Sequence, residues 1–194
     1  MNKTQRQIAV FASGNGSTLQ AIIDAIKSKK LNLKIALVVS DVKDAYALTR
    51  AKDAGIDTYI IKADNKLDID CELEEVLKEY NLDLIVLAGY LRMIGTKLLK
   101  NYTIINTHPS LLPKYGGKGM FGMNVHKAVV ENKETETGVT IHFVDDKYDH
   151  GNIISQTKVP VFEADTPQDV SIRVQIAEKK QLISVLKDFS EGKL

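Results

Sequence analysis

The sequence predicts an α/β protein with a doubly wound, mainly parallel sheet, completed by a C-terminal hairpin and helix. Short runs rich in β-branched and apolar residues alternate with longer stretches of helical period, which is typical of helices layered on a parallel sheet. A glycine-rich turn also follows the first apolar run. The 194 residues fit one domain with a sizeable core, and no linker, repeat or low-complexity segment divides them.

The first half of the chain is predicted to consist of three strand–helix units and a fourth strand. The fourth strand, at residues 84–88, is apolar throughout, as expected for a parallel strand covered on both faces. Gly55 is a suitable end for the second helix. The other strands are expected at residues 8–13, 35–40 and 57–62, and the helices at 17–29, 45–54 and 68–80.

The second half of the chain does not continue the strand–helix units of the first. A buried strand at 102–107 is followed by residues 109–123, whose prolines and glycines predict a long irregular loop of the kind that often serves function. A helix is expected at 125–132. Residues 138–145 and 152–162 are predicted to form a hairpin, and 165–189 to be mostly helix, beginning at Thr166-Pro167. We therefore divide the single domain into a phosphate-binding half, about 1–100, and a catalytic half, about 101–194.

Composition favours small substrates. Lysine and arginine total 26 against 25 acidic residues, so no broad basic surface for nucleic acid or anionic membrane is expected. The only cysteine, Cys71, has no partner for an internal disulfide, which is consistent with a reducing compartment. The apolar run 8–12 is too short for a secretory core or a membrane span. We expect a cytoplasmic protein.

The glycine-rich turn Ser13–Thr18 predicts a phosphate site. Its backbone amides and the helix N-terminus favour an anion, and Ser17 and Thr18 add hydroxyl donors. The turn lacks the Lys-Ser/Thr ending of a nucleotide-triphosphatase loop, and Leu19 stands where a dinucleotide fingerprint has its last glycine. A tight turn without a ligand is the alternative. The expected contacts are Gly14, Asn15, Gly16, Ser17 and Thr18.

The segment after the strand 102–107 predicts acyl-transfer chemistry. Asn106 and His108 stand at positions i and i+2, so their side chains point to the same side at an edge where α/β sheets bind ligands. An amide can donate to an oxyanion, and an imidazolium can donate a hydrogen bond or a proton. Asp149 could supply the carboxylate that keeps an imidazole protonated. A structural histidine and an ordinary turn aspartate are the alternatives.

The other potential ligand residues are less persuasive. His126 begins a helix, His142 alternates within a strand and His150 lies in a turn. With one cysteine and no metal-ligand spacing, a zinc site is improbable.

Four segments in order resemble the phosphoribosylglycinamide formyltransferase family, which is folate-dependent and acts in purine synthesis. The resemblance covers essentially the whole chain and implies a Rossmann-like formyltransferase fold. The segments are Ser13–Ser17, Leu87–Ile94, Asn106–Tyr115, and Gly138–Val144 followed by Asp149.

The resemblance implies that a formyl group passes from 10-formyltetrahydrofolate to the glycine amine of glycinamide ribonucleotide. Asn106 and His108 would stabilise the tetrahedral oxyanion, and Asp149 would raise the pKa of His108 and help move protons. Gln175 and Glu178 match positions that contact the ribonucleotide. No metal is implied, and a monomer or weak homodimer is expected. The positions that match folate contacts are Lys66, Leu91, Arg92, Met93, Ile94, Asn106, Asp145, Asp146, Lys147, Tyr148 and Asp149.

The chain departs from the family pattern at several positions. Thr18 replaces a second asparagine but keeps a hydroxyl, and the loop after Tyr115 is longer than in many relatives. Lys66 stands where an arginine usually meets the folate tail, so the charge is kept but the bidentate geometry is lost. Lys179 replaces a histidine, and the Tyr-Pro that usually follows is absent.

Three other functions remain as alternatives. Methionyl-tRNA formyltransferase shares the Asn-x-His-Pro loop but has a further RNA-binding domain, and formyltetrahydrofolate deformylase, which uses water as acceptor, carries an extra regulatory domain before the first strand. A non-catalytic module that binds a phosphate ligand is the third, because a fold alone does not fix function.

Overall fold

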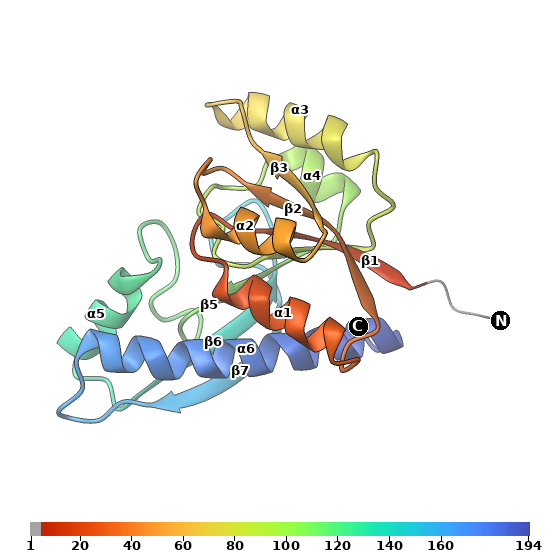
Figure 1. The fold of residues 1–194 in the computed structure, drawn as a ribbon. Helices are drawn as coiled ribbons and strands as arrows, with labels where there is room; N and C mark the ends of the chain where they lie inside the picture. Colours follow the sequence, from red (N-terminus) through yellow and green to blue (C-terminus); the bar gives the residue numbers. More distant parts are fainter. Residues whose placement is uncertain (1–4) are drawn as a thin grey trace. The chain divides into compact units, whose positions relative to one another are not determined.

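The computed structural model describes residues 5–194, except for the side chain of Lys66, and confirms the α/β fold class (Figure 1). Its seven strands follow the order β3-β2-β1-β4-β5-β6-β7, in which the first five have the 3-2-1-4-5 sequence of a doubly wound sheet. The chain divides into two compact units. One contains the residues up to Ile105 together with Leu186–Leu194, and the other contains Asn106–Val185. That these units act as one domain stays a prediction.

Four parallel strands form the centre of the first unit: β1 (Arg6–Phe11), β2 (Leu33–Ser40), β3 (Asp57–Ile60) and β4 (Leu84–Leu87). β1 pairs with β2 on one side and β4 on the other, and β2 also pairs with β3. All four residues of β4 are buried, as its apolar sequence predicted. Since the strands are parallel, the segments that follow them all leave the same edge of the sheet.

Three of the helices in this unit match the helical periods of the sequence: α1 (Ser17–Lys27), α2 (Tyr46–Asp53) and α3 (Lys66–Leu77). The short helix α4 (Thr96–Asn101) was not predicted. Its first turn has no local side-chain cap. Instead, the buried carboxylate of Asp70 in α3 accepts hydrogen bonds from the backbone N–H groups of Lys97 and Leu98 at 2.9 and 3.2 Å. Figure 1 shows α3 and α4 side by side.

The second unit is built on a hairpin and a long helix. Its elements are α5 (Met123–Glu131), β6 (Glu136–Phe143), β7 (Ile153–Pro160) and most of α6 (Pro167–Glu191), and the end of β5 (Ile104–His108) also belongs to it. β6 and β7 pair antiparallel, which confirms the predicted hairpin.

Valines from every layer of this unit meet in one apolar cluster. Figure 1 shows α6 running along β7, and buried valines of α5, β6, β7 and α6 pack together there. The members are Val129, Val139, Val159, Val170 and Val174. At the start of α6, Asp169 accepts from the Thr166 backbone N–H and donates its own N–H to the Thr166 hydroxyl, a reciprocal cap that confirms the predicted start.

The contact between Gly95 and Asp70 leads to a stability prediction. A Cβ on Gly95 would lie 2.0 Å from Asp70 Cγ, so Gly95→Ala must displace the carboxylate that caps α4. We expect the free energy of unfolding to fall by about 1–3 kcal/mol in urea denaturation. Gly14→Ala, where a Cβ meets nothing within 4 Å, should change it by less than about 0.5 kcal/mol. Equal stability of the two variants would contradict this assignment.

Candidate active site

Strand β5 and the turn after β6 bring the three predicted catalytic residues together. His108 Nδ1 lies 3.3 Å from Asp149 Oδ1, and Asn106 Nδ2 lies 3.5 Å from the same oxygen. His108 is 4 % exposed and Asp149 10 %, so these polar groups satisfy one another out of bulk water. The sequence spacing could not establish this contact.

Both ring nitrogens of His108 face acceptors. Nδ1 faces the Asp149 carboxylate, and Nε2 lies 2.7 Å from the carbonyl oxygen of Tyr115. Carbonyl and carboxylate oxygens only accept hydrogen bonds, and an imidazole carries N–H on both nitrogens only when it is positively charged. Each ring nitrogen of His108 therefore has an acceptor within reach.

His142 belongs to this cluster, although its alternation within a strand made it unremarkable in the sequence. Its Nδ1 lies 2.8 Å from the Phe143 carbonyl oxygen, so Nδ1 carries the hydrogen of the neutral ring. Nε2 then accepts from Asn106 Nδ2 at 3.2 Å, which fixes the orientation of the Asn106 amide. The sequence held no signal for this contact, because only the fold brings residues 106 and 142 together, and the pairing of β6 is irregular between Ile141 and His142.

Asp149 is the charged centre of the cluster. Burial by itself would raise the pKa of Asp149, but contacts with His108 and His142 and the Gly117 N–H bring it well below its usual range. Gly117 N donates to Oδ2 at 2.9 Å. The backbone of Asp149 is left-handed, with φ 53°, a conformation that Asp tolerates better than most residues. The carboxylate therefore stays ionised although little of it is exposed to water.

The loop after His108 is tied to the hairpin. The Thr140 hydroxyl accepts from the Leu112 backbone N–H at 3.0 Å and donates to the Ser110 carbonyl at 2.7 Å. Gln156 on β7 donates to the Leu112 carbonyl at 3.0 Å. Further along, the Tyr115 hydroxyl donates to Glu134. These contacts hold the Tyr115 carbonyl against the His108 ring.

The predicted phosphate loop lies in the first unit, between β1 and α1. Gly16 has φ 72°, and a Cβ there would lie 2.7 Å from Ala47, so the turn requires glycine. Gly16 also stands at the N-cap of α1 and offers no side-chain cap, which leaves the first N–H groups of the helix for another acceptor. Asn15 is held by Arg50, which donates to its backbone and side-chain oxygens. Ser17 is half-buried and Thr18 is buried.

The predicted folate segment of the first unit, Leu91–Ile94, follows β4 without regular structure. The Leu91 N–H donates to the Ser13 hydroxyl at 3.1 Å, and Arg92 pairs with Asp41 at 3.0 Å. Leu91 is exposed, whereas Ile94 is buried. The side chain of Lys66, the remaining residue predicted in this unit, lies outside the described part of the chain.

The turn at residues 145–149 in the second unit is closed by its own polar contacts. Asp145 accepts from the Lys147 N–H at 2.9 Å and faces His150 Nδ1 at 2.7 Å. A Cβ on Gly151 would lie 1.9 Å from the Phe143 carbonyl oxygen, so the chain can leave the turn only through glycine. The predicted folate residues Asp146, Lys147 and Tyr148 are exposed on this turn.

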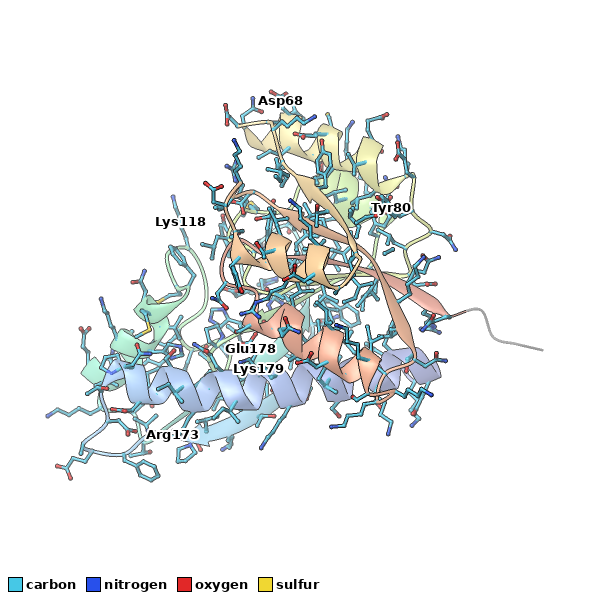
Figure 2. The ribbon with its side chains drawn as sticks, viewed as in Figure 1. Asp68, Tyr80, Lys118, Arg173, Glu178 and Lys179 are labelled. Carbon is cyan, nitrogen blue, oxygen red and sulfur yellow. The ribbon has the colours of Figure 1, made fainter. Side chains whose placement is uncertain are left out.

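The residues predicted to contact the ribonucleotide lie on α6. Figure 2 shows Glu178 and its neighbour Lys179 near the middle of that helix. Glu178 accepts a hydrogen bond from the Thr107 hydroxyl at 2.9 Å, which links it to the strand that carries Asn106 and His108. Gln175 is exposed and donates to the Ser171 hydroxyl.

The described residues, 5–194, contain no group of three or more histidine, cysteine or acidic side chains placed to hold a metal ion. No helix among them is both long and apolar enough to cross a bilayer.

An amide and a histidine at the end of a sheet strand, in contact with an ionised aspartate from a neighbouring turn, suit an acyl-transfer enzyme. The formyl transferase family model matches residues 6–186. The phosphoribosylglycinamide formyltransferase of Escherichia coli strain K12 is 41 % identical over 192 residues, 96 % of this chain and 88 % of the relative. The Haemophilus influenzae enzyme of the same name is 40 % identical over 97 % of this chain and 89 % of its own length.

The fold also matches that of a solved structure with a similar name. Glycinamide ribonucleotide transformylase 1 from Symbiobacterium toebii superposes with a TM-score of 0.90 at 35 % identity, covering 97 % of this chain and 89 % of that one. The chain belongs to the formyl transferase family, and within it to the phosphoribosylglycinamide formyltransferases. It is therefore a transferase.

His126 is expected to make the stability of the protein depend on pH. It is 4 % exposed on α5, and its Nδ1 has no hydrogen-bond partner. Burial, with a smaller contribution from the charge of His108, lowers the pKa of His126 to about 4. Since this value lies below that of an unfolded histidine, about 6.5, the unfolded chain binds more protons between these two pH values. Stability is therefore lost as the pH falls through this window.

We predict that His126→Gln removes this pH dependence. Relative to the variant, the wild type should lose on the order of 3 kcal/mol of unfolding free energy between about pH 6.5 and pH 4. Urea denaturation at intervals of half a pH unit measures the difference. Parallel stability curves for the two proteins would contradict a buried neutral His126.

Proposed function

We propose that this chain transfers the formyl group of 10-formyltetrahydrofolate to the glycine amine of N1-(5-phosphoribosyl)glycinamide, a step of de novo purine biosynthesis. Membership of the phosphoribosylglycinamide formyltransferases supports the reaction. The observation that carries the mechanism is the buried contact of Asn106 and His108 with a single carboxylate, Asp149.

The reaction is an acyl transfer through a tetrahedral intermediate. The amine forms a bond to the formyl carbon, and the bond from that carbon to the folate nitrogen then breaks. The amine loses a proton, and the folate nitrogen gains one. Negative charge collects on the formyl oxygen in between, where donors fixed in advance stabilise it most. In this proposal the donors are the Asn106 amide and the His108 ring.

The orientation of Asn106 supports this role. One N–H of its amide is engaged by His142 Nε2, and the other has only a 3.5 Å contact to Asp149. This second N–H is the one available to an oxyanion. For His108, the available donor is the Nε2–H, which in this structure meets the Tyr115 carbonyl. Donation to the oxyanion therefore requires that hydrogen bond to be exchanged.

Asp149 stabilises the positive charge that His108 carries when both of its nitrogens are protonated, because the two groups lie 3.3 Å apart. The protonated ring is the better donor to an oxyanion. In this proposal Asp149 also receives protons during turnover, since its Oδ1 is close to both histidines of the cluster.

The acceptor is proposed to bind through its phosphate to the loop Gly14–Thr18. The N–H groups at the start of α1 and the Ser17 and Thr18 hydroxyls suit a dianion. Gln175 and Glu178 on α6 are proposed to bind the ribonucleotide. For Glu178, the hydrogen bond with Thr107 connects this role to β5.

The folate is proposed to be held by Leu91–Ile94, the turn Asp145–Asp149, Asn106 and Lys66. The first two segments lie outside regular structure, and backbone N–H and C=O groups of such segments suit the polar edge of a pterin. We further propose that the protein acts in the cytoplasm on small molecules without a metal ion, and that it is a monomer or weak homodimer.

The proposed reaction is tested by following formyl release from 10-formyltetrahydrofolate by absorbance, with glycinamide ribonucleotide present or omitted. Release should require the ribonucleotide. His108→Ala should lower kcat by about 10²–10⁴ while the folate still binds. Release to water alone would indicate a deformylase, and binding without any release would indicate a non-catalytic module.

The phosphate loop makes a separate prediction. Ser17→Ala should raise KM for the phosphorylated acceptor by about tenfold, because a charge-assisted hydrogen bond is lost. KM for the dephosphorylated acceptor, already high, should not change. Ser28→Ala, which lies beyond the far end of α1, is the matched control. If Ser17→Ala raised KM equally for both acceptors, the proposal that this loop binds the phosphate would be contradicted.

A further inference from the structure

Another nearly buried acid, Asp41, lies where several parallel strands of the first unit end. It follows β2 directly, and its side chain is 9 % exposed. The Ser13 hydroxyl donates to Asp41 Oδ1 at 2.5 Å, and Arg92 Nε donates to Oδ2 at 3.0 Å. One carboxylate therefore takes a hydrogen bond from the residue that opens the phosphate loop and another from the segment Leu91–Ile94.

The contacts continue beyond these two donors. The Ser13 hydroxyl also accepts the Leu91 N–H at 3.1 Å. The Arg92 guanidinium donates a further hydrogen bond to the Asp64 carbonyl at 3.2 Å, at the end of the segment that follows β3. Asp41 thus connects the segments that follow all four parallel strands of this unit, β1 to β4.

These contacts require a carboxylate. Each oxygen of Asp41 receives a donor, and a carboxylate has acceptor capacity on both oxygens. An asparagine of the same shape would accept on one side only and would place an N–H₂ group against either Ser13 or Arg92. Because the Asp41 side chain is only 9 % exposed, water would compensate poorly at this carboxylate for the hydrogen bond that is lost.

We propose that Asp41 is a positioning residue that sets the phosphate loop and the folate segment Leu91–Ile94 in register with each other, through Ser13 and Arg92. This rests on the proposed function, because that function assigns one substrate to each segment. Asp41 touches neither substrate in this account. Its loss should weaken the binding of both substrates together, whereas loss of a direct contact would weaken only one.

The fold does not depend on Asp41 alone. The Ser13 N–H donates to the Gly89 carbonyl at 3.0 Å, which joins the ends of β1 and β4 through the backbone. The ring of Tyr90 packs edge-on against Phe11, with centroids 5.3 Å apart. A side-chain substitution at Asp41 should therefore shift the two segments without unfolding the unit.

The experiment compares Asp41→Asn with Asp44→Asn, an exposed aspartate three residues along the chain. Asp41→Asn should raise KM for the ribonucleotide and KM for the folate by about tenfold each, with a smaller change in kcat. Asp44→Asn should leave all three values unchanged. Ser13→Ala should raise both KM values as well, and Ser13→Thr, which keeps the hydroxyl, should restore them.

Combining Ser13→Ala with Asp41→Asn should raise KM little beyond the larger single effect, because both changes remove the same connection. A lowered melting temperature with unchanged KM values would reduce Asp41 to a structural role, and a change in only one KM would contradict the coupling. Wild-type activity is measured first. Absence of transfer in the wild type would contradict the proposed function, whereas unaffected KM values in an active enzyme would contradict only the role of Asp41.

Discussion

The ionised carboxylate of Asp149 is the constraint on which the rest of the second unit depends. A negative charge that is almost out of water is costly unless donors surround it, and here His108, Asn106 and the Gly117 N–H provide them. Those donors come from β5 and from the loop between β5 and α5. The left-handed backbone at Asp149 and the obligatory glycine at 151 place the carboxylate among them. The turn that carries the acid and the strands that carry its partners are thus parts of one arrangement.

The first unit repeats this principle with a different purpose. Asp41 is also a nearly buried acid whose two oxygens are both engaged, but its partners are a serine hydroxyl and an arginine. In the second unit the acid faces titratable rings, which can exchange protons. In the first it faces donors that keep their protons, so it can position but has no means to transfer a proton. In this account a nearly buried, paired carboxylate takes part in the reaction at Asp149, whereas at Asp41 it positions the neighbouring segments.

Local periodicity allowed most of the fold to be predicted, because β-rich runs, the hairpin turn and the Thr166–Asp169 cap are all encoded by near neighbours. Helix α4 was missed because its cap, Asp70, comes from 27 residues earlier. In the site, Asn106 and His108 share a strand, so their common direction followed from the pleat. Asp149 was proposed from its residue type and turn, but its contact with a residue 41 positions away needs the fold. His142 was passed over because alternation in a strand is equally consistent with a structural role.

The central claim is that the Asp149 carboxylate makes the Asn106–His108 pair competent for formyl transfer. The most direct measurement is kcat/KM for formyl transfer in wild type and Asp149→Asn from pH 5 to 9. Asparagine keeps the shape of the side chain and tolerates the left-handed backbone, so the charge is the main change. The account predicts a loss of about 100-fold or more at every pH. Comparable turnover of the two proteins across this range would contradict it.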